Sequence, residues 1–561
     1  MTTNNKIASI FNNIGNMLEI LGDNPFKIRA YKNASKTVQI LKTDIREVAE
    51  QGQLTEIKGI GKDLAQKIND YIKTEKIEYY DELKSRVPEE LLKIRNIQGI
   101  GPKLLQILFN DFNVRNISDL EDTLSDPEFI GLKGVGAKKI NELKVGVKLF
   151  NSYANKINLG IALPSAELLI IELLNIPSIK KAEISGDLLR GKETVELIDI
   201  VISTENQKIT AEETSKLLFI REDTFTSKNG IISFVLDSGI PVQISMSDQN
   251  SFNKLNFIRT GSEIHVNAIM NIYENMAMNL SNQNNEEIYK VLNIQYIPPE
   301  LRECINDIEL AKKYKLPNLI ELSDIKGDLH THSTWSDGKS SIKEMAEAAK
   351  ILGYEYIAIT DHSTSSRIAN GLDEKRLIEK RKELIEIDNS IEDIKIIFGA
   401  EVDIKPDGSL DYSDEVLQGL DMVVASIHSN FKMEEEEMTL RIIKALSNPY
   451  VCALGHPTGR LIGERHPYKL DINKIIDTAK DYGKALEVNS SFMRLDLKDE
   501  HVRLAVDKGV NIIISTDAHN TDQLNQLRYG ISTARRGLAK KENVINTLSQ
   551  EKLLKWLNTF K

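Results

Sequence analysis

Residues 325–338 read IKGDLHTHSTWSDG, a short strand-like run followed by His330, His332 and Asp337. Because alternate residues of a strand face the same side, the two histidines project together from one face. Six more runs of this kind follow downstream: YIAITDHS (356–363), IKIIFGAEVDI (394–404), MVVASIHS (422–429), VCALGHP (451–457), ALEVNSS (485–491) and VNIIISTDAH (510–519). All but 485–491, which closes on Asn-Ser-Ser, carry His, Asp or Glu near their ends.

The seven runs alternate with helical segments over residues 321–561. Such alternation favours parallel strands, arranged either as a barrel or as a wound sheet. A (β/α) barrel places its active site at the carboxyl ends of its strands. We therefore expect the polar residues that close these runs to meet in one place.

The residues that close the runs are of metal-binding type. Imidazole and carboxylate ligands together suit Zn²⁺, Mn²⁺ or Fe²⁺ rather than a thiolate cluster. The candidates, which would also act in catalysis through the metal, are His330, His332, Asp337, His362, Glu401, His428, His456, Asp517 and His519. Nine ligands exceed the needs of one ion, so we expect two or three divalent ions, Mn²⁺ or Zn²⁺, suited to phosphoester cleavage.

Residues 1–150 have the apolar spacing of helices, and three segments in them repeat a pair of glycines before a lysine-bearing helix. The segments IKGIGKDLAQKI (57–68), IQGIGPKLLQIL (97–108) and LKGVGAKKINEL (132–143) resemble the helix-hairpin-helix motif. Glycine permits close backbone approach, and N–H groups at a helix start can face a phosphate. We expect sequence-independent DNA binding by Gly59, Gly61, Lys62, Gly99, Gly101, Lys103, Gly134, Gly136 and Lys138.

Composition and charge set the broad class. The chain has 561 residues, 41% hydrophobic and 28% charged, which is typical of a soluble globular protein of three or four domains and excludes a disordered or fibrous one. The net charge of −11 divides into +2 over residues 1–150 and −13 over the rest. Two cysteines, no signal peptide and no membrane-spanning run indicate a cytoplasmic protein; we also expect a monomer.

The carboxyl-terminal motifs resemble those of the polymerase-and-histidinol-phosphatase (PHP) domain. The matching segments are GDLHTHSTWSDG (327–338), TDHS (360–363), GAEVDI (399–404), SIHS (426–429), GHP (455–457) and STDAH (515–519). The resemblance implies a distorted seven-stranded (β/α) barrel, a three-metal site and metal-dependent phosphoesterase activity. Every ligand position of the motif is filled in this chain.

The whole chain resembles the bacterial family X DNA polymerases that carry a carboxyl-terminal PHP domain. The resemblance rests on the amino-terminal text from residue 5, on the glycine repeats, and on RTGSEIHVNAI (259–269), YIPPELRE (296–303) and LIELSDIKGDLH (319–330). It implies an all-α helix-hairpin-helix region, an α/β nucleotidyltransferase-like palm and thumb, and the barrel. The expected domains are 1–85 (lyase-like), 86–155 (fingers-like), 156–320 (palm and thumb) and 321–561 (PHP).

Within 156–320, residues 182–203 read as strand, loop and strand, and 231–247 read as a hairpin. The palm departs from the family pattern at its metal and triphosphate positions. Where the family has Gly-Ser with two arginines, this chain has GDLLRGKE (186–193), with Asp187, Leu189 and Arg190.

The three metal carboxylates of the palm are expected at Leu197, Asp199 and Ser245, so that only Asp199 keeps an acid. Two Mg²⁺ ions with a triphosphate need several carboxylates to offset their charge. Arg190 and Asp199 are then remnants of a nucleotide site. The sequence argues against Mg²⁺ and dNTP binding there, and we expect polymerase activity to be weak or absent.

Lys67, in the helix of the first repeat, occupies the place of the lysine that forms a Schiff base with abasic sugars in the animal relatives. A desolvated lysine can act as such a nucleophile. The plainer alternative is a lysine that contacts a DNA phosphate.

Together these features predict a DNA-repair enzyme that binds gapped or nicked DNA and processes 3′ ends by 3′–5′ hydrolysis. Abasic-site incision and 3′-phosphate removal are further reactions of the same chemistry. Three alternatives stay open: a gap-filling polymerase, a non-catalytic DNA-end adaptor, and a small-molecule phosphatase of the histidinol-phosphate type. Primer extension, metal content and DNA binding by residues 1–150, respectively, separate them.

Overall fold

The computed structural model describes residues 3–39, 41, 43–97, 99–275 and 285–561. Gln98, inside the second glycine repeat, lies outside the described residues. The chain forms two compact units. One comprises Met1–Ala154 with Gly463–His466, and the other comprises Asn155–Ile462 with Pro467–Lys561.

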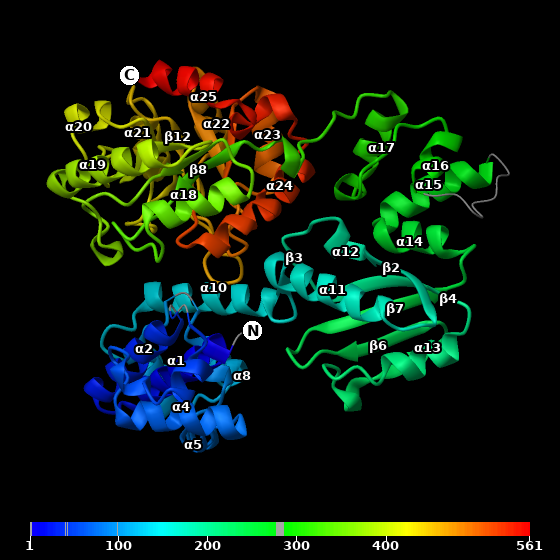
Figure 1. Ribbon diagram of the computed structural model, residues 1–561, viewed down its shortest axis with the longest axis horizontal. Coiled ribbons are helices and arrows are strands. Elements are labelled where there is room, and N and C mark those ends of the chain that lie inside the picture. Colours follow the sequence, from blue (N-terminus) through cyan, green and yellow to red (C-terminus); the bar gives the residue numbers. More distant parts are fainter. Residues whose placement is uncertain (1–2, 40, 42, 98, 276–284) are drawn as a thin grey trace. The chain divides into compact units, whose positions relative to one another are not determined.

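The first unit is built from helices, drawn in blue and cyan in Figure 1. Ile7, Phe11, Ile14 and Leu18 recur at helical spacing on α1, and all four are fully buried in one core. The helices are α1 (Thr3–Leu21), α2 (Pro25–Gln39), α3 (Ile45–Glu50), α4 (Lys62–Thr74), α5 (Glu78–Arg86), α6 (Glu90–Ile94), α7 (Pro102–Asn110), α8 (Ile117–Thr123), α9 (Pro127–Ile130) and α10 (Ala137–Tyr153). The predicted all-α front is confirmed.

All three glycine repeats have the same backbone. The first glycine of each pair is left-handed, with φ of +90° at Gly59, +95° at Gly99 and +92° at Gly134. Only glycine adopts this conformation without strain. The second glycine of each pair caps α4, α7 or α10, and none of these three helix starts has a side-chain cap. Their first N–H groups therefore remain available to a ligand.

The middle of the chain forms a five-stranded sheet in the order β2-β4-β7-β6-β5 (Figure 1). β4 and β7 are parallel, and the other neighbours are antiparallel. The strands are β2 (Ile179–Ser185), β4 (Ile198–Thr204), β5 (Thr226–Lys228), β6 (Ile231–Val235) and β7 (Pro241–Ser247), with β1 (Ile157–Asn158) and β3 (Thr194–Val195) paired separately. The predicted strand–loop–strand and hairpin are both confirmed.

Helices surround this sheet and continue beyond it in the chain. They are α11 (Leu159–Leu174), α12 (Gly186–Leu189), α13 (Gln207–Thr214), α14 (Phe252–Thr260), α15 (Glu263–Asn275), α16 (Asn285–Val291) and α17 (Ile305–Lys312). Phe257, Tyr273 and Tyr289 lie at the centre of a small core shared by helices α14–α16.

The carboxyl-terminal part is a parallel seven-stranded barrel. Its strand order is β14-β13-β12-β11-β10-β9-β8, and a parallel bridge from Thr331 to Ala518 links the two end strands. The strands are β8 (Gly327–Thr331), β9 (Tyr356–Ile359), β10 (Lys395–Asp403), β11 (Met422–Ser426), β12 (Ala453–Leu454), β13 (Ala485–Asn489) and β14 (Ile512–Ser515). Each predicted run contains one of them, so the predicted barrel is confirmed.

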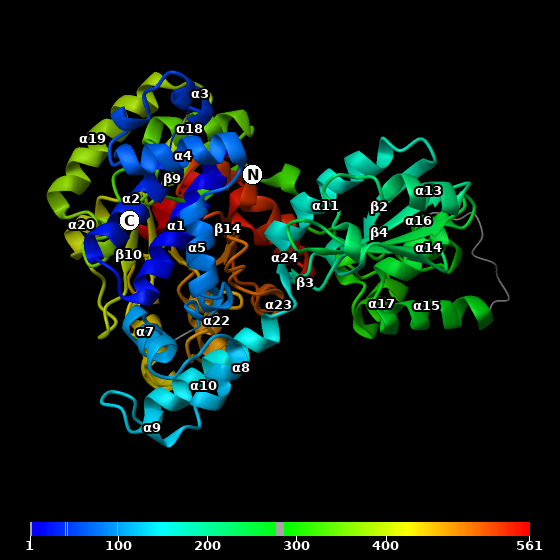
Figure 2. The same ribbon diagram turned by 90° about the horizontal axis from the view of Figure 1, so that it is seen from below.

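Helices cover the outside of the barrel, as Figure 2 shows for α18 and α19. They are α18 (Ile342–Ile351), α19 (Glu374–Ser390), α20 (Asp414–Gln418), α21 (Glu435–Leu446), α22 (Ile472–Asp481), α23 (Asp499–Lys508), α24 (Leu527–Arg536) and α25 (Gln550–Leu557). Because helices lie outside and side chains fill the inside, the strands are apolar on both faces, as the continuous runs predict.

A buried ion pair joins α19 to the strands. Lys380 is fully buried, and its Nζ lies 2.9 Å from Oδ2 of Asp361. The same nitrogen donates hydrogen bonds to the carbonyl oxygens of Ile359 (2.9 Å) and Gly399 (3.0 Å). Asp361 also accepts hydrogen bonds from Ser333 and Ser336. The ammonium thus holds α19, β9 and β10 together.

Replacing Lys380 by methionine should destabilise the protein, because the Asp361 carboxylate would stay buried without its counter-ion. Breaking such a pair typically costs about 3–5 kcal/mol. Thermal and urea unfolding of the full chain measure the effect. Lys382→Met, at an exposed site on the same helix, is the matched control and should stay within about 0.5 kcal/mol of wild type. Equal stability of the two variants would contradict this account.

Candidate metal centre

The nine predicted ligands lie at the carboxyl ends of six barrel strands. His330 lies near the end of β8 and His332 directly follows it, and Glu401 lies near the end of β10. His362, His428 and His456 follow β9, β11 and β12, and Asp517 and His519 follow β14. Asp337 comes from the loop after β8 and is exposed. The barrel therefore brings all nine to one end.

Glu401 is the centre of the cluster and is 1% exposed. Five imidazole nitrogens lie 2.9–3.6 Å from its two carboxylate oxygens: His456 Nε2 (2.9 Å), His362 Nδ1 (2.9 Å), His428 Nε2 (3.2 Å), His330 Nε2 (3.5 Å) and His332 Nε2 (3.6 Å). Burial alone would raise the pKa of Glu401. Positive charge on neighbouring histidines, His428 first, outweighs it and holds that pKa well below the usual range.

The ligand atoms fall into three overlapping groups. These groups are His332, Asp337, His362 and His519; His330, His332 and Asp517; and His362, Glu401 and His428. Within each group the ligand atoms lie within 4.8 Å of one another. His456 joins the last group through its contact with Glu401. Three or four ligands per group is the number that one divalent ion takes from a protein.

Buried atoms without hydrogen-bond partners show that these residues fit metal ions. Among the described residues, the unpartnered atoms include Nε2 of His330, both ring nitrogens of His332 and Nδ1 of His456. Buried polar atoms rarely go unsatisfied, so this many at one place calls for a ligand. Burial also lowers the pKa of His332 to about 4, which keeps its ring in the neutral, metal-binding form.

Two carboxylates that the sequence analysis did not single out orient the ligands. Glu487 accepts a hydrogen bond from Nδ1 of His330 (2.8 Å) and another from the backbone N–H of His456 (2.5 Å). Asp403 lies 2.5 Å from Nδ1 of His428. Such partners fix the ring orientation of metal-binding histidines. An acidic residue inside an otherwise apolar strand was the signal that would have found Glu487.

The cluster opens into a pocket of about 660 Å³. Arg494 lines it from the loop after β13, with Nε 3.8 Å from Oδ2 of Asp517. Its Nη1 is buried and has no hydrogen-bond partner in the described part of the chain. A guanidinium with one unpartnered nitrogen beside this cluster suits an anionic substrate. Arg494 carried no sequence signal, because it lies in a loop.

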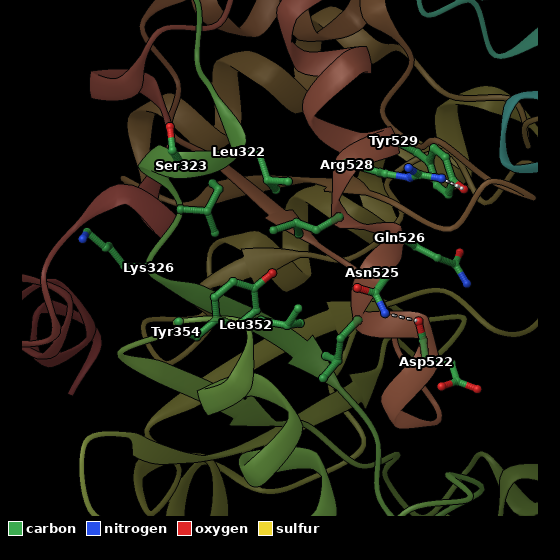
Figure 3. A pocket seen from close by; sticks show the side chains of 14 residues that line it. Leu322, Ser323, Lys326, Leu352, Tyr354, Asp522, Asn525, Gln526, Arg528 and Tyr529 are labelled. Atoms are coloured by element: carbon green, nitrogen blue, oxygen red, sulfur yellow. Dashed lines mark hydrogen bonds between the residues drawn. The ribbon is translucent and has the colours of Figure 1, made fainter. Parts of the chain in front are cut away.

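A second hollow, of about 560 Å³, lies on the outside of the barrel (Figure 3). Leu322, Leu352 and Tyr354 line one side of it, and Asp522 and Arg528 line the other. None of its lining residues is a histidine or cysteine. It is therefore no rival to the metal centre.

The palm has a single carboxylate at the expected metal position, and it is already paired. Arg259 donates to both oxygens of Asp199, at 3.0 and 3.2 Å. The strand register also corrects one expectation. Gln243, not Ser245, lies opposite Asp199 on β7, and Ser245 pairs with Val201. The position beside Asp199 therefore carries a neutral amide, which likewise cannot supply the missing charge.

The other palm residues are bound to each other. Arg190 forms ion pairs with Asp187 and, at 2.9 Å, with Glu303, and it donates to the carbonyl oxygen of Thr260. Leu189, in the place of the family's first arginine, cannot bind phosphate. The remaining cationic group is thus committed to the protein itself.

The predicted DNA-binding glycines and lysines occupy equivalent places in the first unit. Lys62 is the first residue of α4, and Lys103 and Lys138 are the second residues of α7 and α10; all three are exposed. Lys67 differs, since its Nζ lies 2.5 Å from Oδ1 of Asp63 and 5.6 Å from the ring centre of Tyr79.

The barrel with its cluster defines a metal-binding domain of PHP type, and the helical unit is of DNA-binding type. The comparison of protein families agrees, since the PHP domain matches residues 328–491 and the helix-hairpin-helix domain matches residues 2–77. The chain belongs to the PolX family. The DNA polymerase/3′-5′ exonuclease PolX of Bacillus subtilis (strain 168) is 34% identical over 560 residues, which cover 97% of each chain.

Other relatives match the barrel part alone. A probable phosphatase of Thermoanaerobacter sp. (strain X514) is 33% identical over 236 residues, 39% of this chain and 89% of its own. A probable phosphatase of Acetivibrio thermocellus is 33% identical over 201 residues, 34% of this chain and 78% of its own. Every helix of the described residues is too short or too polar to span a membrane.

The purified protein should contain at least two divalent ions per chain, and Glu401→Ala should lose most of them, because this carboxylate contacts five of the histidines. Metal analysis by mass spectrometry measures the content. Glu437→Ala, an exposed acid on α21, is the control and should keep the wild-type content. Chelation should also lower the unfolding temperature, since a ligand at 100 times its Kd contributes about 2.7 kcal/mol. A metal-free protein of unchanged stability would contradict the assignment.

Proposed function

We propose that this protein is a DNA-repair enzyme that binds gapped or nicked DNA and shortens 3′ ends by hydrolysis in its barrel. The observation that carries the proposal is the convergence of nine metal-type ligands in one pocket that Arg494 also lines. The name of the Bacillus subtilis relative supports a 3′–5′ direction of cleavage. A DNA substrate and two free cysteines agree with a cytoplasmic location.

The proposed reaction is hydrolysis of the last phosphodiester bond of a strand. The phosphorus takes the oxygen of water, the leaving 3′ oxygen takes a proton, and a nucleoside 5′-monophosphate is released. The nine ligands would hold Mn²⁺ or Zn²⁺, which would lower the pKa of the attacking water and offset phosphate charge. The mixed imidazole and carboxylate set favours these ions over Mg²⁺.

Other side chains of the pocket orient the ligands and the substrate. Glu487 and Asp403 hold the imidazoles of His330 and His428 in place through hydrogen bonds to their Nδ1 atoms. Arg494 donates to a non-bridging phosphate oxygen, because it lines the pocket beside Asp517 and its Nη1 has no hydrogen-bond partner among the described residues. It thereby orients the phosphate for attack.

DNA is held by the helix-hairpin-helix repeats. Each offers uncapped N–H groups at a helix start, and each adds an exposed lysine in the first helical turn. These groups contact phosphates and do not read bases. Binding is therefore independent of sequence. Action as a monomer on gapped or nicked DNA is part of the same proposal.

A second candidate reaction is removal of 3′-phosphates by the same centre. The barrel's relatives include several probable phosphatases, and the pocket is large enough for a nucleotide. A lyase reaction at Lys67 has weaker support. The ion pair with Asp63 occupies its amine, which argues against a free nucleophile there.

Asp517→Asn should lower exonuclease activity by at least about 100-fold, the usual loss when one electrostatic group of a reacting centre is removed. DNA affinity should stay within a few-fold of wild type. Gly101→Val should lower DNA affinity and leave the hydrolytic centre intact. A side chain there meets open space, so the fold tolerates it, but it stands where a phosphate would approach.

Labelled-primer degradation and fluorescence anisotropy measure the two properties. Wild-type affinity should fall steeply with added salt. Equal loss of affinity and activity in Asp517→Asn would disprove this division of labour.

The palm should not extend a primer with Mg²⁺ and dNTP, because Leu197 and Gln243 supply no charge and Arg259 neutralises Asp199. The assay uses Asp517→Asn protein, so that degradation does not mask synthesis. Template-directed extension by this variant would show that other carboxylates hold the ions. Circular dichroism confirms that the variant is folded.

A further inference from the structure

The loop between β9 and α19 places a bare apolar side chain at the mouth of the metal pocket. Ile368 and its neighbours Arg367 and Ala369 line the pocket together with the ligands. Ile368 has a relative exposure of 106%, the highest among the exposed large hydrophobic residues of the described chain. A single exposed isoleucine is ordinary on a protein surface. An exposed isoleucine on the rim of a candidate metal centre is unusual.

This loop, residues 364–370, is tied down at both flanks of Ile368. Asp411 accepts hydrogen bonds from the backbone N–H and the hydroxyl of Ser365, at 2.6 and 2.5 Å. Ser366 donates to Oδ2 of Asp403 (2.8 Å), whose other oxygen contacts His428. On the far side, Asn370 donates to the carbonyl oxygen of Trp335. The structure thus presents Ile368 on a fixed support linked to a metal-type ligand.

Two cationic side chains share the rim. Arg367 lies next to Ile368, and Lys405 reaches the pocket from the segment after β10. In the described residues, neither side chain forms an ion pair or a side-chain hydrogen bond, unlike most basic groups of the barrel. Two unpaired positive charges at the rim of the metal pocket suit the several phosphates of a polymer. A small monoester has only one phosphate and would not need them.

We propose that residues 364–370 with Lys405 form a docking rim for the 3′ end of a nucleic-acid strand. Ile368 packs against the terminal base and separates it from its neighbour, as apolar side chains do when they enter a base stack. Arg367 and Lys405 bind phosphates on the 5′ side of the scissile bond. The inference rests on the proposed exonuclease function, and it names the residues that would hold the 3′ terminus.

The test compares two substrates of one protein. One is an oligonucleotide with a single-stranded 3′ end, and the other is bis(p-nitrophenyl) phosphate, a diester with no strand to dock. Ile368→Ser should lower the ratio of kcat/KM for the oligonucleotide to that for the small diester by about tenfold, the low end for loss of a base-packing contact. Ile351→Ser, 86% exposed at the end of α18 and outside the pocket, is the matched control and should leave the ratio unchanged.

A second readout does not depend on turnover. The oligonucleotide carries 2-aminopurine at its 3′ terminus and a phosphorothioate at the last linkage, which slows cleavage. Wild type should raise the fluorescence as the terminal base leaves its neighbour, and Ile368→Ser should not, while the anisotropy of the bound DNA stays the same.

The outcomes separate the two proposals. A wild-type protein inactive on both substrates would overturn the proposed function and this inference with it. An active wild type whose substrate ratio and fluorescence are unaffected by Ile368→Ser would overturn the rim alone. Equal effects of Ile368→Ser and Ile351→Ser would also overturn it.

Discussion

The barrel depends on one buried carboxylate. Glu401 is 1% exposed, yet it lies among five imidazoles at the centre of the cluster. Burying so many ionisable groups is unfavourable unless charges are paired or bind cations. Parallel strands bring these groups together, because the carboxyl ends of the strands meet at one end of the barrel. Glu487, Asp403 and Arg494 supply partners from the surrounding strands and loops.

The palm shows the opposite balance. There Asp199 is paired with Arg259, and Arg190 is paired with Asp187 and Glu303. The position opposite Asp199 on β7 holds an amide. Because these residues are neutral or paired with one another, they offer no unpaired negative charge to attract a cation. The two sites therefore divide the chain's chemistry: unsatisfied ligand atoms gather in the barrel, and satisfied ones in the palm.

Local sequence patterns predicted the elements and most ligands, because strand ends and glycine pairs are local features. The spacing of His330 and His332 predicts that both face one side of a strand. The glycine pairs that begin at Gly59, Gly99 and Gly134 predict a turn before a helix. The register of β4 and β7 was not predictable from spacing, so Ser245 was assigned where Gln243 lies. Glu487 and Arg494 were not predicted for a related reason. Their roles depend on contacts with residues far away in the sequence. Ile368 had no signal at all, since an apolar residue in a loop has no pattern.

The Asp199–Arg259 pair also has an evolutionary consequence. A carboxylate restored at residue 197 or 243 alone would stand beside an acid already neutralised, and would add unbalanced negative charge to a half-buried site. Removing Arg259 alone would leave Asp199 exposed to desolvation without a counter-ion. Each single step back is thus unfavourable, although several together would rebuild a cation site. The Asp199–Arg259 pair therefore ensures that no single substitution at these positions creates a cation site in this palm.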